Sequence, residues 1–269
     1  MIVAKERLER ITPKSIANVT DRGYDTQWIH DPQKAPRAIA PAMLSVLKSI
    51  RQVERREDLT MLDFRFGPPL LLNDTVRYEA TMQSGEKFAE LHAIGPAGDN
   101  LQNGKQSTAW IGPQHMATNG TDCEELDVST DPIMHKRIAR ILHSPPIEHG
   151  IHALVLGSKV LLMKMEYPST DLEREILESR DNPDYTKRKT PIYMAINVGL
   201  IHDQRRAVFT PGESVRYSIT AKQSDSRLAE YAVNCEGPHG QIMSATYIVG
   251  KASESLIYRF MRRKTSKLK

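Results

Sequence analysis

The stretch Pro145-Pro-Ile-Glu-His-Gly-Ile-His152, which runs on into the apolar segment 153–162, begins with two prolines and has the length of a helix. Each proline fixes its own backbone and keeps the preceding residue out of the helical region, so the chain arrives extended. The first turn of the helix that follows has unpaired backbone N–H groups at the positive end of its dipole. Gly150 lets a ligand approach this backbone closely, because it has no Cβ. The stretch therefore predicts either an ordinary buried helix with a proline-marked start or a helix N-terminus that holds an oxygen carrying negative charge.

Length and composition indicate a globular protein. The chain has 269 residues, enough for one large domain or two of ordinary size. Hydrophobic residues make up 39%, the mean hydropathy is −0.47, and no run approaches the roughly 18 apolar residues of a membrane helix. Cys123 and Cys235 are too few for a disulfide framework and lack metal-ligand spacing. Because the N-terminus carries no secretory signal, we expect a cytoplasmic protein with two thiols, no metal site and no insertion into a membrane.

The charge balance is mildly basic. The net charge is +4 and the pI is about 9.0, and part of this charge lies in the basic tail expected over residues 255–269. Such a surface suits an anionic partner: a phosphorylated cofactor, an acidic carrier protein or nucleic acid. No nucleic-acid motif accompanies it and only 6% of the residues are aromatic, which argues against nucleic acid.

The chain contains an internal repeat. Three pairs of segments match in order and chemistry: 76–84 with 215–224, Gly95-Pro96 with Gly237-Pro238, and 107–112 with 244–250. Alternating apolar and polar residues predict three strands in each copy, over 76–83, 86–94 and 105–111 and over 215–223, 227–235 and 241–249. An edge segment precedes each set, at 61–66 and at 201–209. The repeat indicates two copies of one fold in a single chain.

Each copy also has a long apolar helix before its strands. Residues 37–50 occupy in the first copy the place of 145–162 in the second, with Pro41 aligned on His149 and Ala42 on Gly150. The second copy is longer between helix and strands, which predicts an insertion at about residues 166–191. We therefore expect an α+β protein in which each half is a curved antiparallel sheet around one helix. The expected halves are residues 1–120 and 121–254, followed by the tail.

This duplicated arrangement resembles the double hotdog fold. Pro146-Ile-Glu-His-Gly-Ile-His-Ala-Leu154 is similar to the helix start "R-P-I-x-H-G-hydrophobic" of the MaoC-like family of (R)-specific enoyl-thioester hydratases and dehydratases, with Pro145 in place of arginine. Val208-Phe-Thr-Pro-Gly-Glu-Ser-Val-Arg-Tyr217 resembles the family's "P-G-D-x-hydrophobic" pattern, with Glu213 in place of aspartate. The likeness covers most of the chain as architecture and a few short segments as motif.

The resemblance implies a substrate and a site. Members act on acyl chains carried as thioesters of coenzyme A or an acyl carrier protein, and they need no metal or redox cofactor. By resemblance, the backbone of Gly150 and Ile151 binds the thioester carbonyl oxygen, and an Asp/His pair upstream moves a water or a proton. The chemistry is consistent, because the reaction passes through an enolate-like state whose charge gathers on that oxygen.

Two Asp/His pairs are candidates for the acid and base. The family has Asp and His five residues apart with Asn-Pro between them; Asp131 and His135 are four apart, Asp25 and His30 are five apart, and both pairs lack Asn-Pro. Asp131 could instead cap a short helix that begins at Pro132, and Asp25 and His30 could lie in a solvated loop. Which half is catalytic stays open at this point.

Two further histidines flank the helix start, and three functions remain open. His149 is either the base itself or fixes the loop by a hydrogen bond, and His152 is expected to be a core histidine and is a secondary candidate. The chain is a lyase on acyl thioesters, a thioesterase in which Asp131, Asp25 or Glu148 activates water, or a non-catalytic acyl-binding protein. Because fused copies can form internally the pair that single-copy members make by dimerising, a monomer is as consistent as a homodimer.

Overall fold

The computed structural model describes residues 2–20, 28–35, 37–53, 61–83, 90–102, 123–142, 149–164, 192–202, 210–222, 228–252 and 254–262. Several expectations lie outside these ranges: Asp25, the strand at 105–111, the insertion at about 166–191 and the prolines at 145 and 146. The side chain of His149 is likewise outside the description, although the backbone of His149 and Gly150 begins a helix.

Within the described residues, ten strands form one sheet in which every pairing is antiparallel. The strands of the first half are β1 (Ile2–Arg10), β2 (Met61–Phe66), β3 (Thr75–Gln83), β4 (Glu90–Gly95) and β5 (Gly98–Gln102). Those of the second half are β6 (Cys123–Ser129), β7 (Ile192–His202), β8 (Ser214–Lys222), β9 (Leu228–Gly237) and β10 (Gly240–Ala252).

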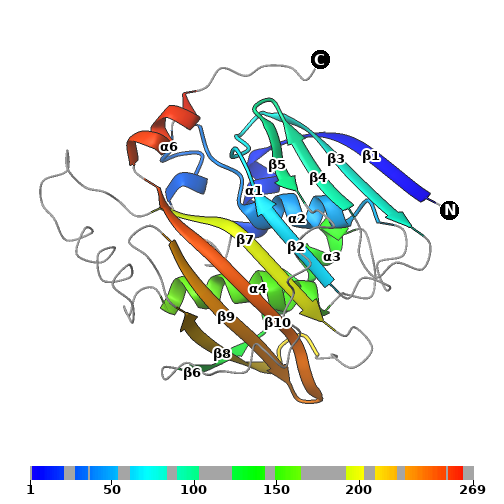
Figure 1. The fold of residues 1–269 in the computed structure, drawn as a ribbon, viewed down its shortest axis with the longest axis vertical. Coiled ribbons are helices and arrows are strands. Elements are labelled where there is room, and N and C mark those ends of the chain that lie inside the picture. The colour runs from blue at the N-terminus through cyan, green and yellow to red at the C-terminus, as the bar shows by residue number, and fades with distance from the viewer. Residues whose placement is uncertain are drawn as a thin grey trace, which may run out of the picture.

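The order of the strands shows the duplication directly. The sheet runs β1-β3-β4-β5-β2-β7-β10-β9-β8-β6, so each half has the same order when it is read inward from its own edge. The halves join where β2 pairs with β7, from Met61 opposite Ile201 to Arg65 opposite Asn197. Figure 1 shows these two strands side by side in the middle of the sheet. The two halves are therefore built alike, and the α+β double arrangement expected from the sequence is confirmed.

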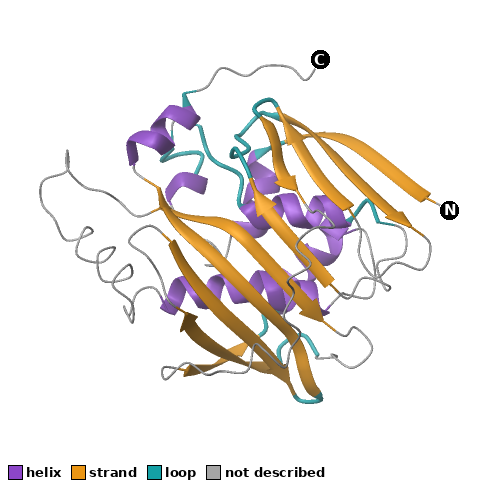
Figure 2. Ribbon diagram, viewed as in Figure 1, coloured by secondary structure: helices purple, strands orange, loops and turns teal. Residues whose placement is uncertain are grey.

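The helices repeat in the same order. The first half has α1 (Pro13–Thr20), the short 3-10 helix η2 (Trp28–His30) and α2 (Ala42–Ile50); the second has α3 (Pro132–Leu142) and α4 (His149–Lys164). The central helix α2 contacts β3, β4 and β5, and α4 contacts β8, β9 and β10. Figure 2 shows the strands of the second half curving around α4. Each half of the sheet thus buries one helix on its concave side.

Matching hydrogen bonds fix which residues of the two halves are equivalent. Arg10 ends β1 opposite Thr75, and Ser129 ends β6 opposite Ser214. In both halves, the residue after the edge strand donates its backbone N–H to the carbonyl of the residue just before the partner strand. Ile11 donates to Asp74 at 2.8 Å, and Thr130 donates to Glu213 at 2.9 Å. The equivalence carries on into the helices that follow, because α1 begins at Pro13 and α3 at Pro132.

Two tyrosines hold α4 against its sheet. The hydroxyl of Tyr217 on β8 donates to the Ala153 carbonyl at 2.7 Å, and that of Tyr247 on β10 donates to the Leu154 carbonyl at 2.9 Å. The ring of Tyr247 can come this close because the helix has Gly157 at the contact, where a Cβ would lie 2.8 Å from the tyrosine oxygen. Both tyrosines are buried, so these hydrogen bonds lie inside the core.

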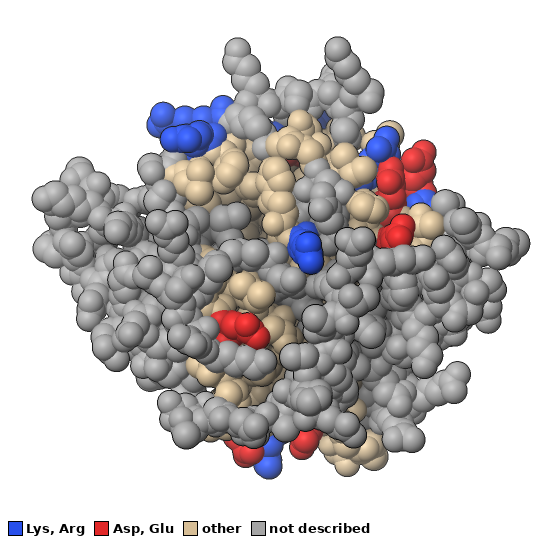
Figure 3. Space-filling view, viewed as in Figure 1, with Lys and Arg blue, Asp and Glu red and all other residues tan. Residues whose placement is uncertain are grey.

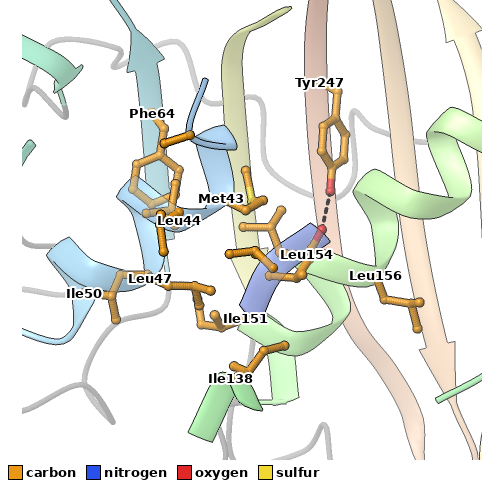
Figure 4. Close-up of a cluster of buried hydrophobic side chains, with 14 of the residues drawn as sticks. Met43, Leu44, Leu47, Ile50, Phe64, Ile138, Ile151, Leu154, Leu156 and Tyr247 are labelled. Carbon is orange, nitrogen blue, oxygen red and sulfur yellow. Dashed lines mark hydrogen bonds between the residues drawn. The ribbon is translucent and has the colours of Figure 1, made fainter. Parts of the chain in front are cut away.

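The cores of the two halves are continuous. Figure 4 shows side chains of α2 meeting those of α3, α4, β2 and β10 in one apolar cluster. Its labelled members are Met43, Leu44, Leu47, Ile50, Phe64, Ile138, Ile151, Leu154, Leu156 and Tyr247. Since α3 belongs to the second half and packs on α1 and α2 of the first, burial of apolar surface holds the halves together.

Four elements differ from the sequence expectation. The helix expected over 37–50 begins only at Ala42, because Ile39 pairs with Leu71 in an isolated β-bridge. β7 spans 192–202 rather than 201–209, because this run pairs with β2 on one side and β10 on the other. β5 begins at Gly98 inside the loop expected over 95–104, where a tight turn is possible because Gly98 has φ 116°. The tail expected from residue 255 instead begins with α6 (Glu254–Met261), because Ile257 and Met261, one turn apart, are both buried.

Within the described residues, no helix combines the length and the apolar character needed to cross a membrane. On the face shown in Figure 3, the described charged side chains lie in a few small groups, and in some of these groups acidic and basic residues are neighbours.

Candidate functional site

The first candidate residues lie at the start of α3. The Asp131 carboxylate accepts a hydrogen bond from the Ile133 N–H at 2.8 Å, and Pro132 is the first residue of the helix. This is the capping arrangement that the sequence allowed for Asp131. His135 follows one turn later, and its own N–H bonds to the Asp131 carbonyl at 2.9 Å.

The side chain of His135 is buried rather than solvated. It is 3% exposed, and its helix packs on α1 and α2 of the first half. The sequence also allowed Asp131 and His135 to be an exposed acid and base at the start of a capped helix. Burial excludes this for His135. An ionisable ring at this depth needs a hydrogen-bond partner, because a buried polar group without one is costly.

The partner of this ring is the other histidine of the second half. Nδ1 of His135 lies 2.9 Å from Nδ1 of His152, and the ring centroids are 4.9 Å apart with an interplanar angle of 63°. His152 is fully buried in the first turns of α4. It is a core histidine, as expected, and its contact with His135 is the feature that the sequence did not indicate.

The contact brings His135 to the N-terminal end of α4. This helix begins at His149, so Gly150 and Ile151 lie in its first turn, where backbone N–H groups have no carbonyl partner within the helix. The side chain of Ile151 is buried in the core, which holds this turn in place. His135, His152 and the first turn of α4 together form the candidate site. It can hold an oxygen at the helix terminus and move a proton at an imidazole.

His30, the candidate of the first half, has a different environment. It is buried, and its Nδ1–H donates to the Ile39 carbonyl at 2.7 Å, so the ring ties η2 to the segment that leads into α2. The solvated loop considered for this histidine is therefore wrong, whereas Asp25 lies outside the described residues.

The central helix of the first half carries charge at its C-terminal end. Lys48 and Arg51 both form ion pairs with Glu9 of β1, and Nε of Arg7 lies 3.1 Å from the same carboxylate. Burial, together with the nearby positive charge of Arg7, lowers the pKa of Lys48 to about 8. The carboxylate of Glu9 is shared among three cations, so burial outweighs its attraction for Lys48. In the alignment that places Pro41 on His149, Lys48 corresponds to buried Leu156.

Among the described residues, no group of three or more His, Cys, Asp or Glu side chains is arranged to hold a metal ion. Both cysteines are free thiols, Cys123 exposed and Cys235 buried.

Solved structures with the same arrangement of strands and helices identify the fold. The chain is similar to full-length peroxisomal multifunctional enzyme type 2 from Drosophila melanogaster, with a TM-score of 0.58, 12% identity and coverage of 91% of this chain and 48% of that one. It is also similar to a Mycobacterium tuberculosis protein described as having a double hotdog fold, with a TM-score of 0.56, 9% identity and coverage of 94% of this chain and 96% of that one. The fold is a double hotdog.

A third similar structure is a MaoC-like dehydratase, with a TM-score of 0.53, 10% identity and coverage of 93% of this chain and 98% of that one. The resemblance to MaoC-like double hotdog proteins is thus confirmed at the level of the fold. This chain spans about half the length of the Drosophila enzyme. No protein-family model matches the sequence, and no curated protein sequence matches it either.

Proposed function

We propose that this protein is a hydro-lyase that adds water to, or removes water from, an acyl chain held as a thioester of coenzyme A or an acyl carrier protein. The observation that carries the proposal is the contact between His135 and His152, which puts a buried imidazole beside the first turn of α4. The double hotdog fold, which this chain shares with a MaoC-like dehydratase, supports the same chemistry.

The proposed reaction uses the polarity of the helix terminus. The thioester carbonyl oxygen accepts hydrogen bonds from the backbone N–H groups of Gly150 and Ile151. Loss of the α-proton moves charge onto that oxygen, so these donors stabilise the transition state more than the ground state. In dehydration, neutral His135 takes the α-proton as the Cα–Cβ double bond forms and the Cβ–O bond breaks, and its imidazolium gives that proton to the departing hydroxyl, which leaves as water. Hydration is the reverse: His135 takes a proton from the attacking water and delivers it to the α-carbon.

We assign the reaction to the second half. Nδ1 of His30 in the first half is engaged by the Ile39 carbonyl, and α2 ends in the ion pairs of Lys48 and Arg51 with Glu9. The second half has apolar Leu156 at the place of Lys48, which suits an acyl chain better than a charge does. A cytoplasmic location suits the two free thiols, which stay reduced there.

The test is the hydration of crotonyl-CoA, followed by loss of enoyl-thioester absorbance with simultaneous measurement of free thiol. A hydro-lyase consumes the enoyl thioester and releases no thiol. Release of thiol would identify a thioesterase, and absence of both signals would favour an acyl-binding protein.

One substitution locates the chemistry. His135→Ala should reduce kcat at least about 100-fold, since general acid–base groups contribute about 10²–10⁴-fold. His239→Ala is the matched control, because this exposed histidine lies in the turn between β9 and β10; it should keep the activity of the wild-type protein. Full activity in His135→Ala would refute the assignment of the base.

A further inference from the structure

The contact between the two histidines restricts where their protons are. A hydrogen bond of 2.9 Å between two Nδ1 atoms needs one N–H donor and one bare nitrogen. Two imidazolium rings cannot make it, because both would present an N–H at this point. When both rings are neutral, they must therefore be opposite tautomers: the ring that donates at Nδ1 has a bare Nε2, and the ring that accepts has an Nε2–H.

The first half shows that the fold does not need a polar pair at these positions. His135 corresponds to Ile16, because Ile16 N–H bonds to the Thr12 carbonyl at 3.1 Å as His135 N–H bonds to the Asp131 carbonyl at 2.9 Å. The alignment of Pro41 on His149 places Leu44 at the position of His152.

Both apolar counterparts are buried, with Ile16 1% and Leu44 0% exposed. An apolar pair therefore packs at these places in one copy. Burying two imidazoles in the other copy requires a hydrogen bond that isoleucine and leucine do not need.

We propose that His152 is the positioning residue for His135: it accepts the Nδ1–H of His135 and so keeps Nε2 of that ring bare and oriented as the base. This rests on the proposed function, in which His135 takes the α-proton. His135 is then the Nδ1–H tautomer and His152 the Nε2–H tautomer. When Nε2 of His135 gains the α-proton, the ring becomes an imidazolium whose Nδ1–H remains bonded to the bare Nδ1 of His152. No other proton has to move.

This places His152 in the orienting role at Nδ1 of His135. The Asp131 carboxylate accepts the Ile133 N–H at the start of α3, whereas the His135 ring bonds to His152 at its Nδ1. A histidine base needs such a partner, because the hydrogen bond made by one ring nitrogen decides the state of the other.

The first experiment reads the tautomers without substrate. Long-range ¹H–¹⁵N correlation spectra of the full chain, labelled at histidine and assigned with the single variants His135→Asn and His152→Asn, should show His135 as Nδ1–H and His152 as Nε2–H. The reverse assignment, identical tautomers or two doubly protonated rings at the assay pH would overturn the proposal. Because this readout needs no turnover, it tests the pair even if crotonyl-CoA proves not to be hydrated.

The second experiment separates positioning from packing. His152→Leu, which introduces the residue of the first half, should lower kcat about 100-fold with KM within about threefold of wild type. In His152→Asn the amide oxygen can again accept from Nδ1–H of His135, so kcat should be at least about tenfold higher than in His152→Leu. A kcat within threefold of wild type for His152→Leu, or no recovery in His152→Asn, would overturn the proposal.

A third variant shows whether the pair is needed for folding. His135→Ile combined with His152→Leu recreates the apolar pair of the first half, and should unfold in urea at a midpoint no lower than that of wild type while losing hydration activity. A clearly lower midpoint would mean that the two histidines hold the fold together, which contradicts the proposal.

Discussion

Replacing Gly157 by alanine should destabilise the protein, contrary to the usual effect of this change in a helix. Glycine inside a helix is about 1 kcal/mol less favourable than alanine, so the substitution normally stabilises. In α4 the new Cβ would lie 2.8 Å from the hydroxyl oxygen of Tyr247 and 3.3 Å from Cε of Met243. The methionine end can move, whereas the tyrosine ring is buried and its hydroxyl is bonded to the Leu154 carbonyl.

The size of the destabilisation follows from the hydrogen bond and the packing that Tyr247 would lose. Moving the hydroxyl breaks a buried hydrogen bond, at about 1–3 kcal/mol, and forcing extra volume into a packed core costs about 1–3 kcal/mol. After the gain of about 1 kcal/mol in helix propensity, the net loss is between about 1 and 5 kcal/mol. Urea denaturation followed by circular dichroism measures it directly.

The matched background is Tyr247→Phe, which removes the atom nearest to the new Cβ. In that background Gly157→Ala should be neutral or stabilising, so the double-mutant cycle should show a coupling of at least about 1 kcal/mol. If Gly157→Ala alone stabilises the protein by about 1 kcal/mol, or if the two changes are additive within about 0.5 kcal/mol, the packing of Tyr247 on α4 is not as described.

Three further outcomes are expected. In native protein, Cys123 should react rapidly with a maleimide while Cys235 does not, because burial raises the pKa of its thiol to about 12; two equally fast thiols would contradict this. Lys48→Met should remove a contribution of this lysine to the pH dependence of the free energy of unfolding. Because the pKa of Lys48 is about 8 in the folded chain and 10.5 in the unfolded one, the unfolded state binds more protons between these values. The free energy of unfolding of wild type relative to the variant should therefore rise by about 3 kcal/mol across that window, and parallel curves would refute it. Asp74→Asn should cost about 3–5 kcal/mol in urea denaturation, because it breaks the buried pair between Asp74 and Arg37, 2.5 Å apart; a loss below about 1 kcal/mol would show that the pair is dispensable.

The repeat made the architecture predictable, because matched strands and helices recur in order along the chain. The outermost strands were not predicted, and the reason is physical. β1 and β6 are the two edges of the sheet, and side chains such as Lys5, Glu6 and Glu125 are exposed there. Edge strands favour charged residues that discourage pairing with another chain, so the alternation of apolar residues that marks an inner strand is weak.

The candidate site was predicted in part. His135 and the first turn of α4 were identified, but the contact with His152 joins residues 17 positions apart on two helices. No spacing rule connects such residues, since only neighbours one turn apart on the same helix meet regularly. A signal was nevertheless present in the repeat. Aligning the copies shows that the polar residues His135 and His152 stand where the other copy has Ile16 and Leu44.

The ionisable side chains discussed above on α2 and α4, Lys48 and Arg51 against His152, lie at opposite ends of these equivalent helices, and the helix dipole accounts for this division. α2 carries Lys48 and Arg51 at its C-terminal end, where partial negative charge favours cations. α4 carries His152 near its N-terminal end, where a lysine or arginine would be disfavoured but a neutral imidazole is not. Only the N-terminal end can stabilise an oxygen that gains negative charge, so a duplicated fold with one reactive copy would need its proton-transfer groups where the second half has them. The first half holds apolar residues at the positions of the two histidines and uses ion pairs to fix α2 against β1.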